Sequence, residues 1–151
     1  MKKLLLLSVI ICLAYACKKD SLSSKPQISF RSYSISSIDT TTQQFDIEFN
    51  VKDGDGDIEN NIYILNYVDG TPPVDENDFP SRQMPGIEAN KGNSVNAIVS
   101  VNMQSNDFRV GIDDNFTPDS FHVRAFIIDN AGNSSDTITT PKIPWYKKKQ
   151  P

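Results

Sequence analysis

The chain has 151 residues, which is enough for one ordinary folded domain. Charged residues make up 23% and hydrophobic residues 38% of the sequence, a balance typical of soluble globular proteins and unlike that of disordered chains. Lys and Arg total 15 against 19 Asp and Glu, so the formal net charge is -4. This acidic balance argues against nucleic acid as a partner, because phosphate backbones require a basic surface, and it is compatible with the attraction of cations.

Residues 1–16 are predicted to be a cleaved signal peptide. Lys2 and Lys3 form a positive start, and residues 4–16, LLLLSVIICLAYA, are almost entirely apolar. This run is shorter than the roughly 20 apolar residues that a spanning helix needs, and it fits the hydrophobic region of a secretory signal. Cleavage would also remove Cys12 and leave Cys17 as the single cysteine, so the sequence predicts a domain without an internal disulfide.

The cut site, Ala14-Tyr15-Ala16-Cys17, resembles the lipobox of bacterial lipoproteins. The resemblance implies a covalent lipid on Cys17 that anchors the chain in a membrane, since each buried methylene contributes about 0.8 kcal/mol. The alternative is an ordinary A-x-A cleavage site that leaves a free thiol. Lys18 rather than Asp follows the cysteine, and by analogy with lipoprotein sorting this favours the outer membrane, on its periplasmic or its surface face. Residues 17–26 are then the lipidated cysteine and a flexible linker.

From residue 27 onward the sequence predicts short strands separated by turns. Residues 45–51, FDIEFNV, form the clearest strand, because four apolar residues alternate with three polar ones and so define a buried and a wet face. Further strands are expected near residues 28–33, 62–68, 83–87, 95–103, 108–112, 121–128 and 135–140. No segment has the pattern of an amphipathic helix. Such a series of about seven or eight strands indicates an all-β, two-sheet sandwich over residues 27–144, followed by a basic tail at residues 145–151.

Two segments resemble a known superfold. Residues 49–58, FNVKDGDGDI, look like the end of the second strand in bacterial immunoglobulin-like and cadherin-like domains, and residues 123–135, VRAFIIDNAGNSS, look like their penultimate strand and the turn after it. The resemblance implies an immunoglobulin-like sandwich without the disulfide and tryptophan of antibody domains, and it carries no function by itself. In such sandwiches the two turns lie at the same end.

Three carboxylates, at Asp53, Asp55 and Asp57, are spaced by glycines. Hard cations such as calcium need several oxygen ligands, and glycines let alternate side chains converge, so Ca²⁺ is the candidate cofactor, with stiffening of this end as its role. The spacing is not that of an EF-hand. The shared end of the sandwich adds three further candidate ligands, namely Asp129, Asn130 and Asn133. The alternative is a plain polar turn, since Asp-Gly pairs form turns without any metal.

Other polar residues are expected to be structural. A second acidic segment, predicted to be a solvated turn, contains Asp113, Asp114, Asn115 and Asp119. His122 is the only histidine and follows an aromatic residue on a predicted strand, where a satisfied, partly buried role is expected. No motif for a nucleophilic serine, a Cys-His pair or a metal hydrolase is present, so the chain is expected not to be an enzyme.

The leading hypothesis is a non-enzymatic binding or spacer module displayed on the cell envelope, with other envelope proteins as partners. The alternative is a carbohydrate-binding surface lipoprotein that assists glycan uptake. It depends on Tyr63 and Tyr67, which share one face of a predicted strand and would present flat rings to a sugar. Packing of the two rings across neighbouring strands is the other interpretation of the same pair.

Overall fold

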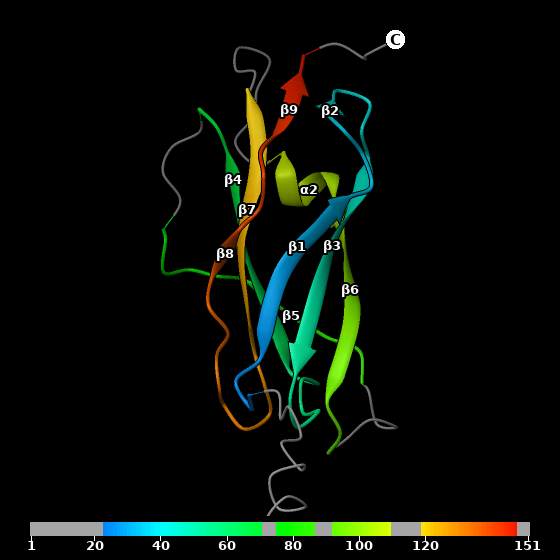
Figure 1. The fold of residues 1–151 in the computed structure, drawn as a ribbon. Helices are drawn as coiled ribbons and strands as arrows, with labels where there is room; N and C mark the ends of the chain where they lie inside the picture. The colour runs from blue at the N-terminus through cyan, green and yellow to red at the C-terminus, as the bar shows by residue number, and fades with distance from the viewer. Residues whose placement is uncertain (1–22, 71–74, 87–91, 110–118, 148–151) are drawn as a thin grey trace, which may run out of the picture.

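The computed structural model describes residues 23–70, 75–86, 92–109 and 119–147. Within these residues the chain forms nine strands and one short helix. They are β1 (Gln27–Tyr33), β2 (Ile38–Asp39), β3 (Gln44–Asp53), β4 (Asn61–Val68), β5 (Ser81–Gln83), β6 (Val95–Gln104), α2 (Ser105–Phe108), β7 (Ser120–Ile128), β8 (Ile138–Thr139) and β9 (Ile143–Tyr146). The strands make two packed sheets (Figure 1), so the predicted all-β sandwich is confirmed. The predicted leader and Cys17 lie outside the described residues.

The first sheet has the order β1-β3-β6 and is antiparallel throughout. In its central strand the apolar residues Phe45, Ile47, Phe49 and Val51 are buried, as the alternation in the sequence predicts. The second sheet has the order β2-β9-β7-β4-β5. Within it β2 runs parallel to β9, the other pairs are antiparallel, and β8 pairs with β7 outside this order.

The core lies between the two sheets, where the inner side chains of β3 and β7 meet. The Phe45 ring packs against the rings of Phe108 and Phe121, at centroid distances of 5.2 and 5.6 Å. The Trp145 ring lies 5.7 Å from that of Phe108 and extends this aromatic group. Full burial of one such side chain stabilises the fold by roughly 1.5–3 kcal/mol, so this group is a major source of stability.

The first residue of one predicted strand, at residues 108–112, belongs to a short helix in the structure. The alternation of Phe108, Val110 and Ile112 predicts a strand, but Phe108 is the last residue of α2, and the other two lie outside the described residues. The Asp107 carboxylate accepts a hydrogen bond from the backbone N–H of Gln104 at 2.7 Å. This contact satisfies a donor that the first turn of a helix leaves free, and so the chain turns after β6 instead of extending.

The predicted boundaries near the C-terminus also differ from the structure. The expected basic tail at residues 145–151 begins inside β9, where Trp145 is buried. The sequence does not predict this strand because it contains Pro144, and proline cannot donate a ladder hydrogen bond and so argues against a strand. The predicted strand at residues 135–140 is reduced to β8, because at Ser135 the side-chain hydroxyl, in place of a backbone carbonyl, accepts the backbone N–H of Ile127 at 3.0 Å and interrupts the regular ladder.

The predicted strand at residues 83–87 is displaced toward the N-terminus. The structure places β5 at Ser81–Gln83, and Pro85 follows it as a residue that cannot donate to a ladder. Ile87 lies outside the described residues.

The two ends of the sandwich carry different elements (Figure 1). β1 begins at the end that also holds the turns after β3 and after β7, whereas β9 finishes at the opposite end. Among the described residues, the four-residue helix α2 is far too short to cross a membrane, and no longer apolar helix occurs.

Candidate metal centre

The carboxylate loop, residues 53–57, begins where β3 ends. Asp53 is the last residue of β3 and has 1% of its surface exposed. Its Oδ2 atom accepts hydrogen bonds from the backbone N–H groups of Gly56 at 2.7 Å and of Asp57 at 3.1 Å. Gly56 has a φ of 70°, a left-handed conformation that favours glycine. The loop therefore folds around the buried side chain of Asp53.

The three carboxylates of this loop converge. One oxygen from each of Asp53, Asp55 and Asp57 lies within 4.8 Å of the others. The Oδ1 atoms of all three are buried, and no described residue donates a hydrogen bond to any of them. The ion pairs that join described residues involve other acids. The loop thus concentrates negative charge that the described part of the protein leaves unpaired.

The crowding and burial of these carboxylates change the pKa of Asp53. Burial raises the pKa of Asp53 above its usual value, and the neighbouring Asp55 carboxyl adds to the increase, while the backbone N–H groups of Asp57 and Gly56 lower it. A raised pKa means that the folded state disfavours the charged form of the group. A cation bound between the carboxylates would reverse this preference, because an opposite charge favours the ionised form.

The spacing of the three oxygens suits calcium. Calcium binds about six to eight oxygen ligands at roughly 2.3–2.6 Å, so any two of its ligands lie within about 5 Å of each other. The 4.8 Å limit on the three carboxylate oxygens meets this condition. Three protein ligands leave room for water or carbonyl oxygens, which calcium also accepts.

A second turn, residues 129–133, contacts the carboxylate loop. The backbone N–H of Asn130 donates to the carbonyl of Asp57 at 2.8 Å, and the N–H of Ala131 donates to Asp57 Oδ2 at 3.0 Å. The Asn60 side chain donates to the carbonyl of Asp129 at 3.2 Å. The two turns therefore lie together at one end of the sandwich. Asn60 is a contributor that sequence patterns did not single out, since an asparagine after a loop has no distinctive spacing.

The predicted ligands in the second turn have other partners in this structure. Asp129 is fully buried, and its two carboxylate oxygens accept the backbone N–H of Asn133 at 2.7 Å and the Asn133 side-chain amide at 2.8 Å. Asn130 is exposed and contacts the carboxylate loop through its backbone. The converging group of described carboxylates thus contains Asp53, Asp55 and Asp57 and does not include Asp129.

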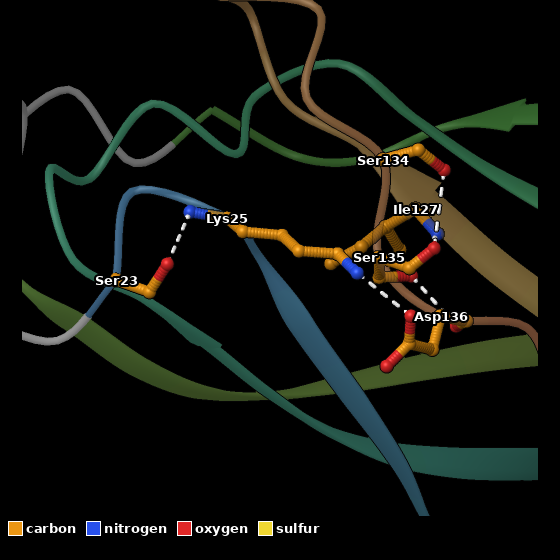
Figure 2. A network of polar contacts seen from close by, with 6 residues as sticks. All are labelled: Ser23, Lys25, Ile127, Ser134, Ser135 and Asp136. Carbon is orange, nitrogen blue, oxygen red and sulfur yellow. Dashed lines mark hydrogen bonds and ion pairs between the residues drawn. The ribbon is translucent and has the colours of Figure 1, made fainter.

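The first described residues of the chain are attached to this same end. Figure 2 shows Lys25 reaching Asp136, with its Nζ atom 2.7 Å from Oδ1, and its backbone N–H directed at the Ser23 hydroxyl. The Asn133 side chain donates to the Ser24 carbonyl at 3.4 Å. The Lys25–Asp136 pair is largely exposed, so it contributes little stability on its own. The pair instead fixes a position: it holds residues 23–26, which precede β1, beside the turn that contacts the carboxylate loop.

The two tyrosines of the carbohydrate hypothesis pack across strands. Tyr63 stacks on Phe126 with ring centroids 4.7 Å apart and an interplanar angle of 2°. Tyr67 stacks on His122 at 4.8 Å and 15°. Both pairs are direct partners between β4 and β7. Each tyrosine thus gives one ring face to its neighbour, and the Phe79 ring packs edge-on against Phe126.

The remaining predicted positions lie apart from the carboxylate loop. Asp113, Asp114 and Asn115 fall outside the described residues, and Asp119 is exposed, with its carbonyl accepting the Trp145 N–H at 3.0 Å. His122 is partly buried on β7 against Tyr67.

Comparisons with protein-family models, with curated proteins and with solved structures find no match to this chain.

Proposed function

We propose that this chain is a non-enzymatic lipoprotein of the cell envelope, anchored through a lipid on Cys17, whose sandwich displays a binding or spacer surface. In this proposal calcium binds Asp53, Asp55 and Asp57 and stiffens one end of the domain. The observation that carries the calcium site is the convergence of three carboxylates, each with a buried Oδ1 atom that receives no hydrogen bond from the described residues. The apolar leader that ends at Cys17 supports the anchor and an outer-membrane location.

The strand order supports the resemblance to immunoglobulin-like domains. The order β1-β3-β6 opposite β4-β7-β9 corresponds to strands A-B-E opposite C-F-G of that arrangement. Domains of this architecture occur in many cell-surface proteins with unrelated functions, so the proposed role in display follows from the anchor and not from the fold.

A calcium ion at this position would act on both turns at once. Asp57 contributes one of the converging oxygens, and it also holds the second turn through its carbonyl and its Oδ2 atom. Fixing the Asp57 side chain by coordination therefore restrains residues 129–133 as well. The proposed ion thus stabilises the end of the sandwich where β1 begins.

A carbohydrate-binding role is the alternative proposal, with Tyr63 and Tyr67 as its residues. A sugar platform needs ring faces that are open to solvent. Cross-strand stacking with Phe126 and His122 already explains the positions of both rings. We therefore prefer the calcium-stabilised display module.

The decisive experiment measures thermal unfolding of residues 23–151 in chelator and in excess calcium. Every described strand lies within this segment. Calcium that binds only the folded state adds about 2.7 kcal/mol at a hundred times its dissociation constant, which raises the melting temperature by several degrees for a domain of this size. The Asp55→Asn variant is expected to lose this increase. The substitution keeps the size and shape of the Asp55 side chain and removes its charge.

In chelator, the melting temperature of Asp55→Asn is expected to change in the opposite direction. Removal of one of three crowded charges relieves repulsion, so Asp55→Asn is expected to melt above the parent chain when calcium is absent. Asp78→Asn, at an exposed position, is the matched control and should respond to calcium as the parent does. An unchanged melting temperature of the parent chain at millimolar calcium would contradict the metal site.

A further inference from the structure

Within the described part of the chain, one edge of the first sheet has no neighbouring strand along its middle. β6 pairs with β3 over its whole length, and no other described strand pairs with it. The carbonyl of Asn102 accepts a hydrogen bond from the Arg82 side chain at 2.8 Å, so it faces away from β3. In an antiparallel pair the backbone groups of alternate residues point the same way. Those of Asn96, Ile98 and Ser100 therefore also face outward, and no described residue bonds to them.

The opposite edge of the same sheet is protected against strand addition. β1 has a register shift between Phe30 and Ser32, and Arg31 on that strand pairs with Glu48 at 3.2 Å. Bulges and charged side chains are two means by which proteins prevent an edge from pairing with another chain. β6 has neither, because its sequence VNAIVSVNMQ contains no charge and its register with β3 is continuous.

Apolar side chains are incompletely covered along this open edge. On the inner face Val95, Val101 and Met103 are buried, whereas Ala97 and Val99 between them are only partly buried. A groove of about 170 Å³ lies there, lined by Ile58, Met84, Pro85, Ala97, Ile98 and Val99 together with Ser100. On the outer face Ile98 has 53% of its surface exposed, the largest exposure of any bulky apolar side chain among the described residues.

We propose that the β6 edge binds a second copy of this chain, by antiparallel pairing of the two β6 strands about a two-fold axis at Ile98. In this register Ile98 faces Ile98 of the copy, and Asn96 faces Ser100. The pairing satisfies the outward backbone groups, buries the exposed Ile98 side chains against each other and lets Ala97 and Val99 of the two chains share the groove. The two three-stranded sheets become one continuous sheet.

A second copy fits the charge and the symmetry of β6. The chain is acidic overall, so most ways of bringing two copies together oppose like charges. β6 is uncharged from Val95 to Gln104, and it can face itself without this repulsion. The strand is also self-complementary about Ile98, as a two-fold interface requires. The Arg82 contact to Asn102 limits the pairing to the middle of the strand.

Disulfide formation between copies tests the proposal and its register. The full chain, expressed with its leader and solubilised in mild detergent, is oxidised with diamide, which accepts the two thiol hydrogens as the S–S bond forms. Directly paired residues of this kind have Cα atoms about 5.5 Å apart, inside the roughly 4.4–6.8 Å range of disulfides. Ile98→Cys is expected to give a covalent dimer. The parent chain, treated in the same way, gives the background from the native cysteines.

Two matched variants fix the register. Ser100→Cys and Asn96→Cys are each expected to give no covalent dimer above the background of the parent chain when oxidised alone, and to form a covalent heterodimer when the two chains are mixed. Ile98→Lys should halve the mass measured by light scattering and keep a cooperative unfolding transition, because the side chain is exposed in the single chain. The proposal is overturned if Ile98→Cys does not cross-link, if Ser100→Cys alone cross-links as efficiently, or if the parent chain is monomeric by light scattering.

Discussion

The backbone carbonyl of Asp57 accepts a hydrogen bond from the backbone N–H of Asn130 at 2.8 Å. This bond joins two turns that are far apart in the sequence, and the Asp57 side chain adds a second bond between them, to the N–H of Ala131. Asp57 is therefore both a candidate calcium ligand and a structural link between the two turns. Substitutions at this position separate the two roles.

Asp57→Asn and Asp57→Ala are expected to differ in stability without calcium. The asparagine keeps an oxygen that can accept the Ala131 N–H, whereas the alanine removes it. One such hydrogen bond contributes about 0.5–1.5 kcal/mol, so the alanine variant should be less stable than the asparagine variant by that amount in chelator. Urea unfolding measures the difference. Equal stabilities of the two variants would show that the side-chain bond does not hold the turns together.

Stability is expected to fall as the pH drops below the ordinary pKa of His122. Burial lowers the pKa of His122 from 6.5; the Asp69 carboxylate opposes this shift and the Lys142 ammonium adds to it. The unfolded chain then binds more protons than the folded chain between pH 6.5 and the lower folded-state pKa. The stability present above pH 6.5 is lost as the pH falls through that window.

Because His122 is the single histidine, its ring protons report this titration directly by NMR. His122→Gln should flatten the pH dependence of the unfolding free energy in the same window, whatever its effect on stability at neutral pH. A folded-state pKa at or above 6.5 is the result that contradicts the prediction.

The Tyr33 hydroxyl is expected to contribute to the attachment of the two sheets. It lies 2.5 Å from the Thr140 hydroxyl and donates to the Pro141 carbonyl at 2.9 Å. The Thr140 hydroxyl also accepts the buried N–H of Val123 at 2.9 Å. Tyr33→Phe should cost about 0.5–1.5 kcal/mol, and Thr140→Val should cost more, roughly 1–3 kcal/mol, because it leaves a buried donor unsatisfied.

A double-mutant cycle in urea checks this order. The two residues share a bond, so their combined cost should be smaller than the sum of the single costs. Strict additivity would indicate that the two hydroxyls act independently.

Cys17→Ser is expected to abolish lipid attachment. The parent chain recovered from membranes should carry a mass increase from acyl chains on its N-terminal cysteine, as measured by intact mass spectrometry. The serine variant lacks the thiol that the lipid requires. A parent chain that begins at Cys17 with an unmodified thiol would instead support ordinary cleavage at Ala14-Tyr15-Ala16.

Regular alternation was the part of the fold that the sequence predicted best. Phe45 to Val51 alternate without interruption, and β3 covers that segment with every apolar residue inward. The helix at Ser105–Phe108 was missed because four residues are too few to show a helical period, and its capping contact uses Gln104 and Asp107 in place of the usual serine or threonine and glutamate. β9 was missed because Pro144 occupies it.

The candidate site was only partly predictable for a different reason. Asp-Gly spacing shows that Asp53, Asp55 and Asp57 can converge, and the resemblance to a two-sheet sandwich places residues 129–133 nearby. Neither pattern reveals that both oxygens of Asp129 accept hydrogen bonds from Asn133, four residues later in its own turn. Whether a side chain such as that of Asp129 bonds within its own turn or reaches another loop depends on the local backbone conformation, which a single sequence does not specify.

β1 begins at the end of the sandwich that carries the carboxylate loop, and β9 finishes at the other end (Figure 1). A chain anchored before β1 and pulled from the end of β9 would therefore be stretched along its strands. The ladder between β1 and β3 would then be loaded in shear, with its hydrogen bonds strained together and not opened one after another. With such an anchor, strand direction would make the attachment of the first strand resistant to force, and a cation at the loaded end would strengthen the point where that force enters.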